Sequence, residues 1–193
     1  MRRRPVSLTE TPLLAWGDAL RAAKRRRRRL RRRMAAVGCS LALLLAPAIV
    51  PPTPRLVWNA STSAPMGLYW ITPGASIEPG EMAVARPPQA FRRMAAERHY
   101  LPMNVPLVKR AVATAGDEVC ALGHQIFLNG RWLTVRKSRD HAGRPMPMWL
   151  GCIRLRGRQL FLLMDSPASF DGRYFGVTEG DDVIGGARLL WAR

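Results

Sequence analysis

The sequence predicts a mostly β domain that follows an N-terminal transmembrane helix. Three observations lead to this expectation. A strongly basic arm opens the chain, and an uncharged apolar segment follows it directly. The remainder alternates short runs of β-branched and aromatic residues with glycine and proline turns, and it has little helical character. A chain of 193 residues is long enough for one modest domain with appendages.

The basic arm covers residues 1–33. It holds 13 Lys and Arg residues against two acidic residues, so about +11 of the formal net charge of +18 lies there. Such a run binds nucleic acid, lies on an anionic membrane surface or marks the cytoplasmic side of a membrane anchor. The 17 uncharged, mostly apolar residues 34–50 favour the anchor, because basic residues are retained in the cytoplasm. DNA binding is the weaker interpretation, and we expect no specific nucleic-acid partner.

Residues 34–50 also fit a second interpretation, a secretory signal that is cleaved. The absence of a clean small-x-small site after the apolar run favours a retained anchor. Both interpretations export residues 51–193. We therefore expect a cytoplasmic N-terminus, an inner-membrane location and a periplasmic domain.

The limits of the helix follow from proline. Pro5 and Pro12 are expected to leave residues 1–20 as a poorly ordered or weakly helical tail. Residues 21–33 can continue as a helix into the apolar segment. The stretch PPTP (51–54) is expected to end the helix and form a stiff exit.

The exported part reads as a series of short strands. Asn129-Gly130 is a tight-turn signal at the centre of a hairpin over residues 124–135. A polar loop is expected over residues 136–149, and another over 166–178. The other expected elements are an extended approach (55–62), strands at 67–73, within 79–88, at the start of 106–119 and at 156–165, a short helix within 89–101, and a final strand pair within 181–193.

Three cysteines are present, and Cys39 lies in the apolar segment. Cys120 and Cys152 form an even pair in the exported part. In an oxidising compartment we expect these two to form a disulfide. The alternative is two buried thiols. Two lone cysteines lack the spacing of metal ligands, so we predict no metal site.

The first candidate for chemistry is Ser63, in the stretch NASTSAPMGLYW (59–70). Pro65 and Gly67 can fix a turn that keeps the Ser63 hydroxyl exposed at the edge of the domain. The backbone N–H of Ser63 and the hydroxyl of Ser61 could then donate to a developing oxyanion. The alternative is an ordinary Ser/Thr/Pro turn that leads into a strand.

The second candidate is Lys109, in LVKRAVATAG (107–116). Side chains alternate along a strand, so Lys109 is expected to share a face with Leu107, Ala111 and Ala113. Burial lowers the pKa of a lysine, and a neutral amine can take the proton of a serine hydroxyl. The alternative is a lysine that extends to solvent from a half-buried strand.

The third candidate is the loop DSPASFDGRYFG (165–176). Asp171 and Arg173 could form an ion pair beneath the site, and Ser169 could orient Lys109. The alternative is a polar surface loop.

Other mechanisms find no support in the sequence. The three histidines, His99, His124 and His141, lie in unrelated polar contexts. No GxSxG elbow, HExxH, Cys/His cluster or phosphate-binding loop is present. We therefore expect no cofactor, and a lysine is the available base.

Taken in order, three segments resemble the type I signal-peptidase superfamily, and more closely its conjugative-transfer branch, the TraF-like peptidases that mature pilin subunits. TSAPMGLYW (62–70) resembles the nucleophile box and VKRAVATAGDEV (108–119) the lysine box. SFDGRYFG (169–176) resembles the last box, and AGRPMPMW (142–149) the loop before it. Ser-x-Pro replaces the longer spacing of housekeeping enzymes, and Thr114-Ala115 stands where the family usually has proline.

The resemblance implies roles for residues. Ser63 would be the nucleophile and Lys109 the general base of a Ser-Lys dyad. Ser61 would be the side-chain oxyanion donor. Ser169 would position the lysine, and Asp171 and Arg173 would form a structural pair. The implied fold is an antiparallel β signal-peptidase-like catalytic domain tethered at the membrane.

The implied function is a membrane-anchored serine endopeptidase that processes, and in this branch can cyclise, a pilin precursor for conjugative transfer. Its partners would be the pilin precursor, the inner membrane and components of the mating-pair or type IV secretion apparatus. Two alternatives stay open. One is a housekeeping type I signal peptidase that acts on many exported preproteins. The other is a non-enzymatic, membrane-anchored assembly factor.

Overall fold

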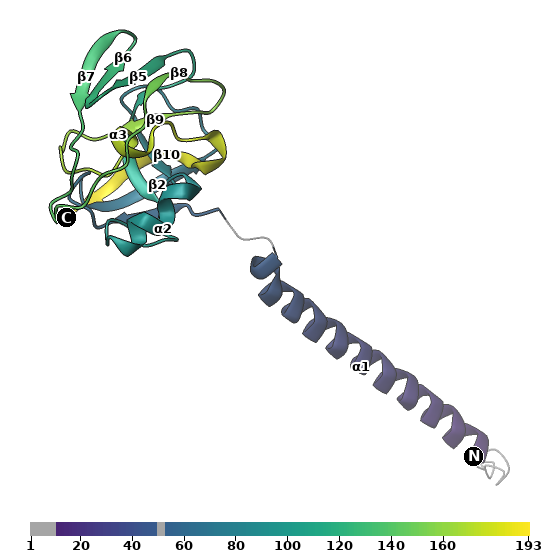
Figure 1. The fold of residues 1–193 in the computed structure, drawn as a ribbon. Coiled ribbons are helices and arrows are strands. Elements are labelled where there is room, and N and C mark those ends of the chain that lie inside the picture. The colour runs from purple at the N-terminus through teal and green to yellow at the C-terminus, as the bar shows by residue number, and fades with distance from the viewer. Residues whose placement is uncertain (1–10, 50–52) are drawn as a thin grey trace, which may run out of the picture. The chain divides into compact units, whose positions relative to one another are not determined.

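The computed structural model describes residues 11–49 and 53–193 of the chain. Contacts divide the chain into two compact units, Met1–Pro52 and Thr53–Arg193. The first unit contains one long helix, and the second contains β-sheets with short helices (Figure 1).

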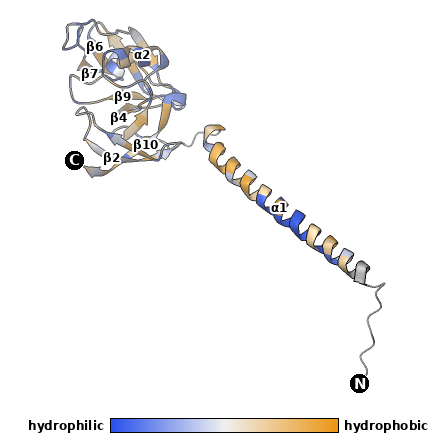
Figure 2. Cartoon of the chain, turned by 90° about the horizontal axis from the view of Figure 1, so that it is seen from below, coloured by the Kyte–Doolittle hydropathy of each residue, from blue (hydrophilic) through white to orange (hydrophobic). Residues whose placement is uncertain are grey.

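The helix α1 runs from Thr11 to Ile49 without interruption. The charged run lies midway along it and the apolar stretch follows, as Figure 2 shows. The expectation that Pro12 interrupts helix formation is wrong. Pro12 stands in the first turn of α1, where a missing N–H costs no helical hydrogen bond. By length and composition, α1 could cross a membrane. Residues 50–52, with the end of the predicted apolar segment and the start of PPTP, lie outside the described residues.

The second unit is built from antiparallel strands, which confirms the predicted mostly β class. Strand β2 spans the predicted residues 67–73, and helix α2 lies within the predicted 89–101. The strands are β1 Leu56–Asn59, β2 Gly67–Pro73, β3 Met82–Ala85, β4 Leu107–Ala113, β5 Glu118–Leu122, β6 Gln125–Leu128, β7 Arg131–Val135, β8 Gly151–Arg154, β9 Phe161–Leu163 and β10 Val183–Ala192; the helices are α2 Gln89–Glu97, α3 Gly172–Phe175 and the 3-10 turn Gly180–Asp182.

The larger sheet has six strands in the order β1-β2-β10-β3-β4-β9. Its central strands β3 and β4 are buried on both faces, because successive side chains enter different apolar clusters. Ala83 and Leu107 belong to one cluster, while Val84 and Val108 belong to another. Strand β4 is therefore a rigid, dry support for any side chain that it carries.

The smaller sheet has the order β7-β6-β5-β8. The predicted hairpin is present as β6 and β7, and Asn129 and Gly130 both have positive φ at its turn. Strands β5 and β8 were not expected as separate elements. Every residue of β8 is exposed, and its sequence therefore needs no alternation of apolar and polar residues, the pattern that predicts a strand. Cys120 lies directly opposite Cys152 across β5 and β8, and the two form a disulfide.

The expected strand pair at the C-terminus is wrong. Residues 183–192 form one strand, β10, which pairs with β2 on one side and β3 on the other. Gly185, near the start of this strand, serves close packing of β10 against β2. A Cβ on Gly185 would lie 2.3 Å from the carbonyl oxygen of Thr72, whereas a Cβ on Gly186 would meet nothing closer than 3.8 Å.

This difference predicts unequal effects of two neighbouring substitutions. Gly185→Ala should lower the free energy of unfolding by about 1–3 kcal/mol, because backbone atoms of β2 must move apart. Gly186→Ala, the matched control, should change it by less than about 1 kcal/mol. Denaturant unfolding of the full chain in detergent measures both. Equal effects would contradict the packing role of Gly185.

Candidate active site

Ser63 lies in the loop that joins β1 to β2, residues 60–66. The loop is held from inside by a buried side chain, Asn59, the last residue of β1. The Asn59 amide nitrogen donates to the carbonyl oxygens of Ser61, Ala64 and Pro65, at 3.0, 3.2 and 3.0 Å. Its amide oxygen accepts the Ser61 N–H at 3.1 Å. The Ser63 side chain is half-buried at this loop.

Lys109 enters the site from β4. Its Nζ lies 2.6 Å from the Ser63 Oγ and 2.9 Å from the Ser169 Oγ. The side chain is only 5% exposed. It lies opposite Ala83 of β3 and on the face that carries Leu107 and Ala111, as the strand alternation predicted. The alternative of a lysine that extends to solvent is therefore excluded.

The predicted alternation fails at the end of β4. Ala113 is buried, but it belongs to the apolar cluster under the smaller sheet and not to the cluster of Leu107 and Ala111. The pairing of β4 with β9 shifts register between Ala111 and Ala113, which turns the following side chain toward different neighbours.

Burial determines the protonation of Lys109. Removal from water penalises the charged amine and lowers the pKa of Lys109 from 10.5 to about 8. The negative charge of Asp171 acts in the opposite direction, and the positive charge of Arg173 lowers the pKa of Lys109 further. About a tenth of the Lys109 amines are neutral at pH 7, and about half at pH 8.

The Ser63 hydroxyl is also in contact with Ser61. The two oxygens Ser61 Oγ and Ser63 Oγ are 2.9 Å apart, and the Ser63 N–H donates to Ser61 Oγ at 3.3 Å. Two donors, one backbone N–H and one hydroxyl, thus converge beside Ser63. A substrate carbonyl oxygen that replaced their mutual hydrogen bond could accept from both.

Beneath the lysine lies a buried ion pair. Arg173 Nε and Nη2 each donate to one carboxylate oxygen of Asp171 at 2.9 Å. Asp171 is fully buried and Arg173 is 2% exposed. The Asp171 carboxylate also accepts the N–H of Met164, and the Arg173 guanidinium donates to the carbonyl oxygens of Met164 and Ser166. These bonds fix both ends of the loop that carries Ser169.

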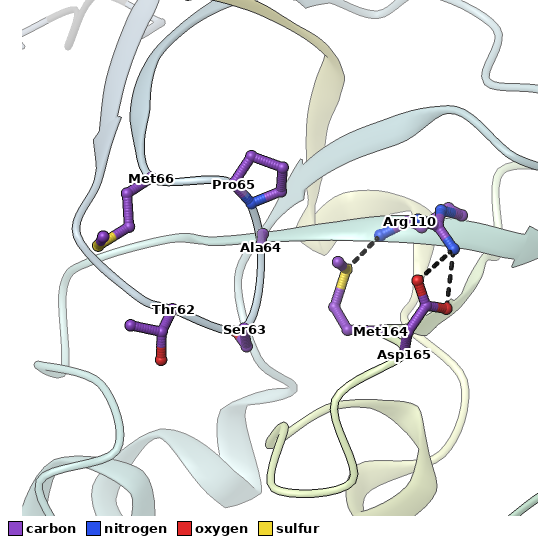
Figure 3. A pocket seen from close by; sticks show the side chains of 8 residues that line it. All are labelled: Thr62, Ser63, Ala64, Pro65, Met66, Arg110, Met164 and Asp165. Carbon is purple, nitrogen blue, oxygen red and sulfur yellow. Dashed lines mark hydrogen bonds and ion pairs between the residues drawn. The ribbon is translucent and has the colours of Figure 1, made fainter. Parts of the chain in front are cut away.

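An open cleft of about 370 Å³ adjoins Ser63. The loop Thr62–Met66 lines one side, and Arg110, Met164 and Asp165 line the other (Figure 3). Arg110 and Asp165 form an exposed ion pair at 3.0 Å. An extended peptide that entered this cleft would meet the Ser63 hydroxyl.

The structure thus brings together the six residues selected from the sequence, Ser61, Ser63, Lys109, Ser169, Asp171 and Arg173. His99, His124 and His141 are exposed and lie apart from these contacts. The turn after β4 is closed without proline, because Thr114 donates its N–H to the Asp117 carboxylate at 2.9 Å.

Sequence reasoning did not assign a role to Asn59. A signal was present: an Asn at the end of a predicted strand, immediately before a Ser-rich turn, is a residue whose side chain commonly binds nearby backbone groups.

Comparisons with known proteins identify the family of the chain. The family model described as signal peptidase, peptidase S26, matches residues 28–192. Two proteins called plasmid transfer protein TraF, both from Escherichia coli, are similar. One is 34% identical over 160 residues, which cover 77% of this chain and 89% of that protein; the other is 35% identical over 129 residues, which cover 61% and 72%.

A crystal structure of a signal peptidase I from Enterococcus faecalis V583 has 18% sequence identity and a TM-score of 0.33, over 58% of this chain and 97% of that one. The family match covers most of the chain, including the loop of Ser63 and the strand of Lys109. The resemblance to TraF-like peptidases is confirmed, and the chain belongs to the signal peptidase family, peptidase S26.

Proposed function

We propose that this protein is a membrane-anchored serine endopeptidase in which Ser63 is the nucleophile and Lys109 the general base. The observation that carries the proposal is the 2.6 Å distance between the buried Lys109 Nζ and the Ser63 Oγ. A lysine with a pKa of about 8 supplies enough neutral amine near pH 7 to accept a proton from a hydroxyl.

The hydrogen bonds give the amine a direction. A neutral amine has one lone pair and two N–H groups. Donation of an N–H to the Ser169 Oγ, at 2.9 Å, leaves the lone pair free for the Ser63 O–H. Ser169 therefore positions the base, and the Asp171–Arg173 pair holds Ser169 through the backbone of its loop.

The first half of the reaction forms an acyl-enzyme. The Ser63 Oγ attacks the carbonyl carbon of the scissile peptide bond while its proton passes to Lys109 Nζ. The Ser63 N–H and the Ser61 hydroxyl donate to the oxyanion. When the tetrahedral intermediate collapses, the C–N bond breaks and the Lys109 ammonium returns the proton to the leaving amine. Lys109 is then neutral again.

The second half releases the acyl group. A water molecule attacks the ester carbonyl and gives a proton to Lys109, which passes it to the Ser63 Oγ as the ester bond breaks. An amine of the substrate can take the place of water, and the product is then a peptide bond, which for an N-terminal amine of the same chain is a cyclic product.

The proposed substrate is a pilin precursor of a conjugative-transfer system. The similarity to two plasmid transfer proteins supports this choice over a general preprotein peptidase. Small residues such as Ala are expected in the cleaved segment, as the likeness to signal peptidases implies. Components of the mating-pair or type IV secretion apparatus are the corresponding partners.

The proposed location is the inner membrane, with the N-terminus cytoplasmic and the catalytic unit periplasmic. The basic run before the apolar half of α1 supports this orientation. An exposed face of β1, β2 and β10 is also suited to a membrane surface. It carries Trp58, Trp70 and Trp191, which are 44%, 42% and 63% exposed, and the rings of Trp58 and Trp191 lie 5.9 Å apart. Tryptophan is enriched at membrane interfaces.

Substitution of the two dyad residues tests the mechanism. Ser63→Ala and Lys109→Arg should each lower kcat on a prepilin by about 10³-fold or more, because the first lacks the nucleophile and the second stays charged. Gel analysis of a co-expressed prepilin follows its conversion. The exposed Ser76→Ala and Lys137→Arg variants are the controls and should process normally. Full processing by Ser63→Ala would refute the nucleophile assignment.

The pH dependence tests the base. Only the neutral form of Lys109 is active, so kcat/KM should fall about tenfold per pH unit below the pKa of about 8 and level off above it. Initial rates from pH 6 to 10 on a synthetic prepilin peptide measure this profile. A rate that is constant from pH 6 to 9, or one that still rises tenfold between pH 9 and 10, would be inconsistent with the buried amine as base.

A reporter fusion tests the location. Alkaline phosphatase fused after Arg193 should be active, since it folds only after export, whereas β-galactosidase at the same position should be inactive. Intact mass of the membrane-bound protein should include α1, which distinguishes an anchor from a cleaved signal. The reverse pattern of reporter activities would exclude a periplasmic catalytic unit.

A further inference from the structure

We propose that Asn59 is a positioning residue of this site: its carboxamide holds Ser61, and through Ser61 the hydroxyl of Ser63, in the geometry that the reaction requires. The inference rests on the proposed function and adds a residue that neither the sequence motifs nor the comparisons assign. Asn59 touches no reacting atom, so its effect on catalysis would pass through the loop.

Asn59 makes two hydrogen bonds to the backbone of Ser61. The Asn59 Oδ1 accepts the Ser61 N–H at 3.1 Å, and the Asn59 Nδ2 donates to the Ser61 carbonyl oxygen at 3.0 Å. Both peptide groups of one residue are thus fixed by a single side chain. Ser61 Oγ in turn lies 2.9 Å from the Ser63 Oγ and accepts the Ser63 N–H. In the described part of the chain, Asn59 and Ser63 are the side chains that hydrogen-bond Ser61.

The Asn59 amide also binds the backbone of the two residues that follow Ser63. Nδ2 donates to the carbonyl oxygens of Ala64 and Pro65, so Asn59 joins the segments before and after Ser63. An amide nitrogen has two hydrogens, and three acceptors must share them. Asn59 is 7% exposed and pairs with Gly67 across β1 and β2, which makes it a fixed base for the loop.

The expected loss in kcat when the Asn59–Ser61 hydrogen bonds are removed follows from the role of Ser61. An oxyanion donor stabilises the transition state only while it is held at hydrogen-bond distance, and removal of one such donor costs about 10²–10³-fold in kcat. A loop freed from Asn59 keeps Ser61 but no longer fixes it. We expect a smaller loss of about 10–100-fold in kcat, with KM changed by less than about threefold because the cleft is retained.

The matched control is another hydrogen bond to the same loop. The Tyr69 hydroxyl donates to the Pro65 carbonyl oxygen at 2.8 Å and makes no bond to Ser61. Tyr69→Phe therefore removes one hydrogen bond to the loop and leaves the Asn59–Ser61 hydrogen bonds intact. Its kcat should stay within about threefold of the wild-type value.

The experiment compares wild type, Asn59→Leu and Tyr69→Phe as full-length protein in detergent, with a synthetic prepilin peptide. Leu has a similar size but makes no hydrogen bonds. The kcat is referred to folded protein, and the pH profile should keep its midpoint near 8, since the pKa of Lys109 is set by burial and by the charges of Asp171 and Arg173, which Asn59 does not contact. If Asn59→Leu does not fold, Asn59→Ser takes its place, since a hydroxymethyl group cannot span from Ser61 to Pro65.

A second measurement does not depend on activity. Hydrogen–deuterium exchange with mass spectrometry should show at least tenfold faster exchange in peptides covering residues 60–66 of the Asn59 variant than in the wild type or Tyr69→Phe. Faster exchange together with a lower kcat supports the proposal. An unchanged kcat per folded molecule, or unchanged exchange, overturns it.

The two proposals can fail separately. Normal processing by Ser63→Ala would refute the peptidase mechanism and with it the catalytic part of this inference. The exchange data would then still decide whether Asn59 holds the loop. If instead Ser63→Ala is inactive and Asn59→Leu is fully active, the mechanism stands and the positioning role of Asn59 is refuted.

Discussion

Burial of the Lys109 amine is the constraint on which the site depends. The side chain crosses an apolar face formed by the central strands β3 and β4, where Ala83 and Ala111 are fully buried. Small neighbours leave room for the four-carbon stem but exclude water. The lowered pKa, from 10.5 to about 8, corresponds to about 3 kcal/mol against the charged form. This cost lowers the free energy of unfolding by its full amount below pH 8. It disappears as the pH rises toward 10.5, because the unfolded chain binds the proton more tightly than the folded protein.

The polar groups around the Lys109 amine hold it in one position. Two hydroxyls, Ser63 and Ser169, are the hydrogen-bond partners of the amine, so a neutral Lys109 uses its lone pair and one of its two N–H groups. The Asp171–Arg173 pair brings no net charge, and its remaining bonds go to backbone groups of the loop that carries Ser169. A buried ion pair is weak evidence for stability, but removal of either partner would leave the other charge buried and unpaired.

Local rules predicted the elements that depend on neighbouring residues. Asn129-Gly130 marked the hairpin because both positions need positive φ, and the alternation of β4 placed Lys109 on the apolar face. The failures have tertiary causes. Strand β8 is exposed throughout and carries no pattern. One strand, β10, with Gly185 at its close approach to β2, stands where the sequence suggested a strand pair. The bulge before Ala113 depends on pairing with β9, which is distant in sequence.

The sequence by itself determined the strand of Lys109, the turn of Ser63 and the polar loop of Ser169, because each rests on spacing and residue type within a few positions. It also determined an apolar helix preceded by a basic run. Only the tertiary structure decided that these segments meet. In the sheet, β10 and β3 lie between β2 and β4, so strand pairing cannot bring Ser63 to Lys109. The 2.6 Å contact joins two side chains that are 46 positions apart in the chain, and the burial that lowers the pKa of Lys109 comes from packing of its strand against other elements.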